Sequence, residues 1–197
     1  MCIRDSQHTA LDLHDRKCDQ NLARLHKAGI LGVRTVSGDA CELDEVLTSF
    51  DAMLGKPVKF DTVFIDAPCS GTGTMRRHPE IPWRLTENDV TTELPKLQLM
   101  MLKEAAARVA AGGELIYATC SVFDEENTQV VDAFLASPEG ACFTVAPLSE
   151  AQILQLPDFE QAKKLVFVRQ NDRGLFQSVP VNADSYDGHF CARLIRK

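Results

Sequence analysis

The stretch FIDAPCSGTG, residues 64–73, places an aspartate and a cysteine where an apolar run opens into a glycine-rich loop. The run itself, Asp61–Asp66, is short and continuous, which predicts a strand that is covered on both faces. Asp66 ends the strand, and Cys69 lies just inside the loop. In open α/β sheets, ligands bind beyond the carboxyl ends of the strands. The stretch therefore predicts a buried strand that brings an acid and a thiol to a binding edge.

Short apolar runs alternate with helical patterns on both sides of this stretch. We expect strands over His8–Leu13, Gly32–Ser37, Asp61–Asp66 and Glu114–Thr119, with helices over Arg16–Ala28, Glu42–Leu54, Glu93–Ala110 and Glu125–Ala136. A polar loop from 67 to about 90 precedes the third helix, and strand-like runs at Lys164–Arg169 and His189–Ile195 close the chain. This alternation predicts a parallel sheet with right-handed crossovers and helices on both faces.

The predicted strands lead directly into polar side chains of a reactive kind, namely Asp12, Asp39, Asp66 and Cys120. Aspartate is common at helix N-caps and turns, so local structure explains each acid taken alone. The carboxyl ends of parallel strands share one edge of a sheet, however, and all four side chains are expected there. Their coincidence predicts a ligand site at that edge.

The composition indicates one soluble domain. Among 197 residues, 45% are hydrophobic and 25% are charged, and no apolar run is long enough for a membrane span. The N-terminal residues lack the apolar core of a signal peptide, so we expect a cytoplasmic protein. The net charge of −7 disfavours nucleic-acid binding by bulk electrostatics. Any contact with nucleic acid must then come from a local patch.

The seven cysteines are scattered and form no CxxC pair. An odd number in a chain of this kind predicts reduced thiols instead of a disulfide framework. A zinc site needs clustered ligands, so we expect no metal. A monomer is the expected state.

Two longer stretches carry a family resemblance. DAPCSGTGTMRRHPEIPW (66–83) and GGELIYATCSVFDEEN (112–127) resemble the Sun/Nop-type RNA cytosine-5 methyltransferases, most closely their bacterial 16S rRNA members. The closing DGHFCARLIRK (187–197) is similar to the family's last strand motif. The resemblance implies a Rossmann-like class I fold with a mostly parallel sheet, which binds S-adenosyl-L-methionine (SAM).

One part of the family pattern has no counterpart in this sequence. The family's catalytic domain opens with a strand and a loop of the form CAAPGGKT, which holds SAM. Residues 1–8, by contrast, do not resemble the family. We therefore expect a partial catalytic domain over 9–197 that lacks the first strand, the glycine-rich loop and the family's RNA-binding region. Weak SAM binding by the chain as written follows from that expectation.

The resemblance also implies a set of catalytic roles. A thiolate that adds to C6 of cytosine makes C5 nucleophilic toward the methyl group of SAM, while an acid at N3 balances the developing charge. By resemblance, Cys120 is the nucleophile, Cys69 is the thiol that helps to release the product, and Asp66 contacts N3. The chemistry alone does not separate the two thiols, and a pair of core cysteines is the structural alternative.

The resemblance assigns the remaining acids to the cofactor. Asp12 should hold the ribose hydroxyls of SAM, and Asp39 should meet the adenine amino group. Asp66 should also lie at the amino-acid end of SAM.

The loop after Cys69 carries the candidates for RNA contact. Arg76, Arg77 and His78 form a short basic cluster that is expected to touch RNA phosphates, with an ordinary solvated loop as the alternative. Trp83 and Phe123 are candidates for stacking on a flipped base, and a core position is the alternative for Trp83.

Two further interpretations of the whole chain stay open at this point. A DNA cytosine-5 methyltransferase would use similar chemistry, although YATCS and the RRHPEIPW loop argue against it. A non-catalytic remnant would keep the motifs without holding SAM. An amino-methylating enzyme is disfavoured because such enzymes use an Asp/Asn-Pro-Pro-aromatic loop without a thiol.

Overall fold

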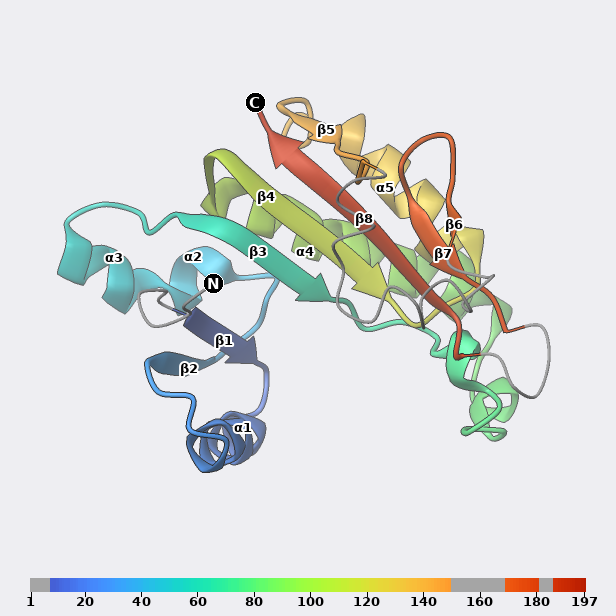
Figure 1. Ribbon diagram of the computed structural model, residues 1–197, viewed down its shortest axis with the longest axis horizontal. Helices are drawn as coiled ribbons and strands as arrows, with labels where there is room; N and C mark the ends of the chain where they lie inside the picture. The colour runs from blue at the N-terminus through green and yellow to red at the C-terminus, as the bar shows by residue number, and fades with distance from the viewer. Residues whose placement is uncertain (1–7, 150–168, 181–185) are drawn as a thin grey trace. The chain divides into compact units, whose positions relative to one another are not determined.

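The computed structural model describes residues 8–149, 169–180 and 186–197 (Figure 1). The chain divides into two compact units, Met1–Val58 and Lys59–Lys197. Every helix within the described ranges is too short or too polar to span a bilayer.

The first unit is a two-stranded parallel sheet with three short helices. Its elements are β1 His8–Asp12, α1 Asp15–Lys27, β2 Val33–Ser37, α2 Leu43–Val46 and α3 Thr48–Leu54. The two strands run in parallel register from His8 opposite Val33 to Asp12 opposite Ser37. The expected strands and the first helix are confirmed. The expected single helix Glu42–Leu54 is wrong, because the chain turns at the buried Leu47 and the Thr48 hydroxyl donates to the Asp44 carbonyl at 2.9 Å.

The second unit is built on one mixed sheet. Its strands are β3 Phe60–Asp66, β4 Val109–Thr119, β5 Phe143–Val145, β6 Arg169–Gln170, β7 Phe176–Ser178 and β8 His189–Arg196, in the order β3-β4-β8-β7-β6 with β5 beside β8. The β3–β4 pair is parallel, as expected from the strand–helix alternation. All other pairs described in this sheet are antiparallel. The parallel prediction therefore holds for the alternating strands and not for those nearer the C-terminus.

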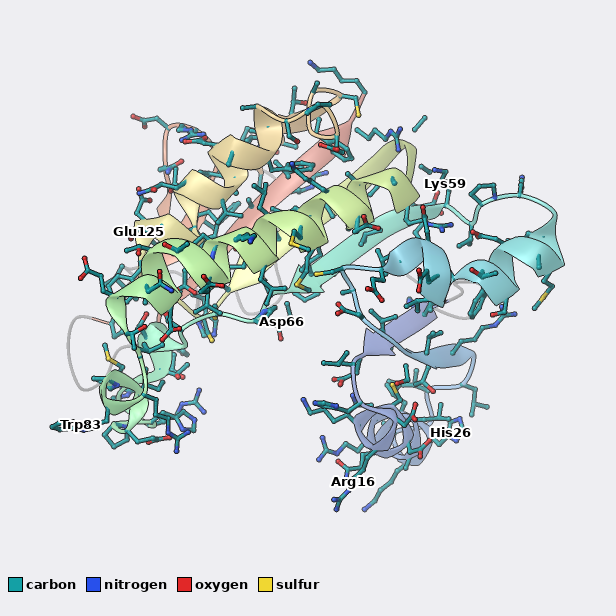
Figure 2. The ribbon with its side chains drawn as sticks, turned by 180° about the vertical axis from the view of Figure 1, so that it is seen from behind. Arg16, His26, Lys59, Asp66, Trp83 and Glu125 are labelled. Atoms are coloured by element: carbon teal, nitrogen blue, oxygen red, sulfur yellow. The ribbon has the colours of Figure 1, made fainter. Side chains whose placement is uncertain are left out.

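Two helices cover one face of this sheet, α4 Leu94–Arg108 and α5 Thr128–Leu135, as both views show (Figures 1 and 2). The core between helices and sheet contains Leu102, Leu115 and Phe134, which are fully buried. Alternate residues of β4 and β8 face this core, because successive side chains of a strand point to opposite faces. The predicted strand His189–Ile195 is confirmed, and of Lys164–Arg169 only Arg169 lies within the described residues.

Two expected boundaries change. Strand β4 begins at Val109, earlier than Glu114, because Val109 already pairs with Phe60. The regular ladder resumes with Thr62 opposite Glu114, and the residues between bulge outward at Gly112, whose φ is 75°. A glycine pair that predicts the end of a helix thus serves a bulge inside a strand.

Helix α5 begins later than expected from the sequence. A 3₁₀ turn, Asp124–Glu126, precedes it, and Asn127 separates the two with φ −114° and ψ −98°. The side chain of Asn127 is turned inward, where its amide donates to the Ser121 carbonyl at 3.0 Å. This contact replaces the helical continuation that the sequence pattern predicts.

A close backbone approach ties the loop after β3 to the chain entering β8. The Gly73 N–H donates to the Cys120 carbonyl at 2.8 Å, and the Gly188 N–H donates to the Gly73 carbonyl at 2.8 Å. A Cβ atom at Gly73 would lie 2.1 Å from the Gly188 carbonyl oxygen. Only glycine fits at this position.

We predict that Gly73→Ala destabilises the protein by about 3 kcal/mol or more, because the clash is with backbone that cannot rotate away. Gly112→Ala is the matched control, since a Cβ there meets nothing within 4 Å and adds only the strain of its φ of 75°, roughly 1–2 kcal/mol. Urea unfolding of both variants measures the difference. Equal losses would mean that the approach at Gly73 is not rigid.

Candidate active site

Two free thiols meet where β3 and β4 end. The strands run parallel with Asp66 opposite Ala118, so the loops that follow them start side by side. Cys69 and Cys120, one on each loop, are half-buried, and their Sγ atoms lie 3.3 Å apart. The expectation that both cysteines follow strand ends is confirmed, β3 and β4 are neighbours, and neither cysteine is fully buried in the core.

The contact makes the two thiols unequal. A hydrogen bond from the Cys69 thiol lowers the pKa of Cys120 to about 6, although burial and the Asp66 carboxylate act in the opposite direction. The same hydrogen bond, together with burial, raises the pKa of Cys69 far above its ordinary value. The contact thus favours the thiolate form at Cys120 and the protonated form at Cys69.

A histidine from β8 also acts on Cys120. The β4–β8 ladder ends with Thr119 opposite Phe190, and the residues just beyond this pair are Cys120, which follows β4, and His189, which begins β8. A positive charge on His189 helps to lower the pKa of Cys120. The imidazole Nδ1 lies 3.2 Å from the Asp187 carbonyl oxygen. Sequence reasoning included His189 in a strand motif but gave it no role.

Asp66 is the last residue of β3 (Figure 2), three positions before Cys69 in the sequence. Its side chain is exposed, and its charge raises the pKa of Cys120, so the carboxylate and the sulfur are close enough to interact. An exposed carboxylate next to a thiolate is available to a ligand that approaches the sulfur. The predicted grouping of Asp66 with both cysteines is present.

A buried carboxylate bonds the serine that follows each of the two cysteines. Glu126 is fully buried, and its Oε1 accepts the Ser70 N–H at 2.8 Å and the Gln98 amide at 3.1 Å. Its Oε2 accepts the hydroxyls of Ser70 and Ser121. The Thr72 hydroxyl lies 3.1 Å from that of Ser70 and 3.4 Å from that of Ser121. One carboxylate thus joins the loop after β3 to the loop after β4.

A second set of contacts fixes the segment that carries Glu126. The Tyr117 hydroxyl donates to the Glu126 carbonyl at 2.6 Å. The Thr119 hydroxyl donates to the Asn127 side-chain oxygen at 2.6 Å, and the Asn127 amide donates to the Ser121 carbonyl at 3.0 Å. Side chains of β4 therefore fix the turn before α5 through hydrogen bonds.

Sequence reasoning missed this polar network. The available signal was the repeated Cys-Ser pair, Cys69-Ser70 and Cys120-Ser121, which places a hydroxyl next to each thiol. Glu126 belongs to an acidic run, DEE, whose composition is typical of a solvated helix start. Nothing in the run itself distinguishes the buried acid from its neighbours.

The two other predicted acids lie at one edge of the β1–β2 sheet in the first unit. This sheet is separate from the one that contains β3 and β4, so the expectation that all four side chains share one sheet edge is wrong. Asp12 ends β1, and its Oδ1 accepts the His14 N–H at 3.0 Å. Asp39 follows β2, and its Oδ1 accepts the Cys41 N–H at 2.8 Å. These carboxylates accept hydrogen bonds, so they fit a ligand that donates from hydroxyl or amino groups, such as a nucleoside.

The predicted basic cluster is present but partly neutralised. Arg77 Nε donates to Asp187 Oδ2 at 2.7 Å, and an Arg76 guanidinium nitrogen lies 3.6 Å from Asp187 Oδ1. His78 Nδ1 lies 3.4 Å from a carboxylate oxygen of Glu80. The two arginine side chains remain 45% and 60% exposed. They can still reach a phosphate, with Asp187 holding them in place.

Trp83 is 89% exposed, so the alternative of a core position is wrong. Figure 2 shows its ring projecting away from the loop that carries it. Phe123, next to the Cys120 loop, is 38% exposed. A large aromatic side chain held in water is available for stacking.

Known proteins resemble this chain along most of its length. The family model described as 16S rRNA methyltransferase RsmB/F matches residues 2–195. The ribosomal RNA small subunit methyltransferase B of Salmonella arizonae is 39% identical over 140 residues, which are 71% of this chain and 27% of that relative. Its Klebsiella pneumoniae namesake is 47% identical over 78 residues, 40% of this chain and 18% of the relative. The chain spans about a quarter of the length of such relatives, as the 27% coverage shows.

Solved structures share the fold. NSun6 from Pyrococcus horikoshii with SFG has a TM-score of 0.70 at 19% identity, over 97% of this chain and 41% of that chain. A methyltransferase homolog protein from the same organism has a TM-score of 0.68 at 22% identity, over 98% of this chain and 54% of that chain. The expected Rossmann-like methyltransferase fold is confirmed.

We predict that iodoacetamide alkylates Cys120 with a midpoint near the pKa of about 6 and leaves Cys69 largely unmodified at neutral pH. The thiolate of Cys120 forms as the pH rises through that midpoint and is lost below it. Cys69→Ala removes the hydrogen-bond donor, so the midpoint of Cys120 should rise toward the ordinary thiol value of about 8.5. Peptide-resolved mass spectrometry across pH measures both sites, with the half-buried Cys142 as an internal reference. An unchanged midpoint in Cys69→Ala would contradict the contact.

Proposed function

Because the chain belongs to the 16S rRNA methyltransferase RsmB/F family, we propose that it carries the catalytic thiols of an enzyme that methylates C5 of a cytosine. The substrate is 16S ribosomal RNA, the methyl donor is SAM, and the reaction passes through a covalent cysteine adduct. The observation that carries the proposal is the thiol pair 3.3 Å apart, in which Cys120 has a pKa lowered to about 6. A thiol mechanism needs reduced cysteines, which fits the proposed cytoplasmic location.

Cys120 is the nucleophile in this proposal. Its thiolate forms a bond to C6 of the cytosine, and the electron pair of the C5–C6 double bond moves toward N3 through the ring. Asp66, in its protonated carboxylic acid form, donates its proton at N3, where the negative charge develops. The exposed position of Asp66 beside the thiol pair supports this role. Carbon C5 is then electron-rich.

Cys69 assists the departure of Cys120. After C5 has been substituted, a base removes the C5 proton, the C5–C6 double bond forms again and the bond from C6 to sulfur breaks. A leaving thiolate is stabilised by a donor at its sulfur, and the protonated Cys69 thiol lies 3.3 Å away. A proton donor suits this step better than attack, which supports the assignment of the two roles.

SAM supplies the methyl group when it is bound. We assign Asp12 to its ribose hydroxyls and Asp39 to its adenine amino group, because each carboxylate offers an oxygen at the edge of a parallel sheet. The role of Asp66 at the amino-acid end of the cofactor stays a prediction, as does the monomeric state.

The loop after Cys69 is the proposed RNA contact. Arg76, Arg77 and His78 would meet phosphates, which position the RNA without reading its sequence. Trp83, being 89% exposed, would stack on a base. The rRNA family favours RNA over the DNA alternative.

We predict that the two cysteine variants fail at different steps. With the exchanges made at the matching positions of a full-length family member, Cys120→Ala abolishes the covalent protein–RNA adduct and methylation. Cys69→Ala allows attack but slows elimination, so the adduct accumulates. Denaturing gels of each variant incubated with SAM and target RNA measure both outcomes.

An adduct that accumulates in Cys120→Ala and not in Cys69→Ala would reverse the two roles. If neither variant forms an adduct while both stay folded and bind RNA, the two-thiol mechanism is wrong. Ser137→Ala provides a control for general loss of stability, because Ser137 is a buried serine beyond the C-terminal end of α5.

We further predict that Arg77→Ala weakens RNA binding and makes its salt dependence shallower by about one unit in log–log slope. Trp83→Ala should weaken binding by about 1–3 kcal/mol through lost stacking, with the slope unchanged. Lys103→Ala is the control, since Lys103 lies on α4 near Glu139. Filter binding at several salt concentrations separates these effects. An unchanged slope with a collapsed turnover for Arg77→Ala would place the arginine in the chemistry instead.

A further inference from the structure

The two reactive loops are built alike around one acid. Ser70 follows Cys69, and Ser121 follows Cys120. Both serine hydroxyls donate to Glu126, which is fully buried and has no part in the chemistry proposed above. The Ser70 N–H adds a second bond from the first loop at 2.8 Å.

We propose that Glu126 is a positioning residue, which holds the Cys69 and Cys120 thiols in contact by binding the serine next to each of them. The proposal rests on the proposed function only for what the thiol pair is used for. The spacing of the sulfur atoms is a property of the folded chain by itself.

The Glu126 carboxylate holds the two loops together because it is fully buried and has no water as an alternative hydrogen-bond partner. We call this carboxylate and its bonds to Ser70 and Ser121 the Glu126 clamp. A buried carboxylate is destabilised by every hydrogen-bond donor that is missing, because no water replaces the lost partner. Glu126 receives donors from the loop after β3, from the loop after β4 and, through Gln98, from α4. Any change in loop spacing would leave at least one of these groups unpaired.

The clamp is itself anchored at both ends. Gln98, whose amide contacts Glu126, also donates to the Pro68 carbonyl at 2.9 Å, one residue before Cys69. The Tyr117 hydroxyl fixes the Glu126 backbone from β4 at 2.6 Å. Because these partners are themselves held in place, Glu126 keeps the distance between the two loops fixed.

The spacing has a chemical readout. The S–H···S contact needs the two sulfur atoms within hydrogen-bonding distance, and it lowers the pKa of Cys120. The other groups facing Cys120 are Asp66 from β3 and His189 from β8, and neither contacts Glu126. A loosened clamp should therefore raise the alkylation midpoint of Cys120 while those two groups stay in place.

The test uses single serine changes on the present chain. Ser70→Ala and Ser121→Ala each remove one hydroxyl from Glu126, and we expect the alkylation midpoint of Cys120 to rise by about one pH unit or more. Ser137→Ala is the matched control. Its hydroxyl bonds the Phe134 carbonyl at 2.7 Å beyond the far end of α5, so its stability loss should leave the midpoint unchanged.

Two changes at the acid itself sharpen the result. Glu126→Ala removes every bond and should raise the midpoint most. Glu126→Gln keeps the shape, with its oxygen facing the Ser70 N–H and its amide facing two hydroxyls that can accept, so it should restore a midpoint within about half a unit of the wild type. Melting curves show which variants are folded.

Unchanged midpoints in folded Ser70→Ala and Ser121→Ala would overturn the proposal, as would an equal shift in Ser137→Ala. The readout needs neither RNA nor SAM. If the midpoints stay unchanged while protein–RNA adducts form normally, only the role of Glu126 is wrong. If the midpoints shift as expected but the protein does not methylate RNA, only the proposed function is wrong.

Discussion

The hydrogen bonds to the buried carboxylate of Glu126 are the interaction on which the site depends. Burial removes water as a partner, so the protein must supply every donor. It does so from two loops and a helix that are far apart in the sequence. Each of these segments begins or ends at the same sheet, and the sheet therefore defines where the donors meet. The thiol pair is a feature of the second unit alone.

The two cysteines of the pair differ in pKa although their side chains are identical. Two cysteines in an unfolded chain share a pKa of about 8.5. In the fold, the two sulfur atoms lie 3.3 Å apart, and this contact lowers the pKa of Cys120 and raises that of Cys69. His189 adds to this difference from the antiparallel strand β8. A mixed sheet thus brings a group to the thiolate that the parallel strands could not supply.

The sequence identified what strands and motifs determine directly. Asp66 and Cys120 could be placed because each follows a short apolar run, and parallel neighbours end at one edge. Glu126 could not be placed, since an acid in an acidic run resembles a solvated one until its donors are known. Asn127 breaks a predicted helix because its side chain bonds β4, a contact that no local pattern contains. For Trp83, the sequence left stacking and a core position both open, and the 89% exposure of the side chain excludes the core.

The exposure of Trp83 makes it a spectroscopic reporter. It is the only tryptophan of the chain, and 89% of its surface meets water. Its emission in the folded protein should already lie near that of indole in water, so unfolding would shift the spectrum little. A nucleic-acid base stacked on the ring would quench that emission. The intrinsic fluorescence of this protein is therefore insensitive to its stability and is a direct, label-free measure of what touches the loop after Cys69.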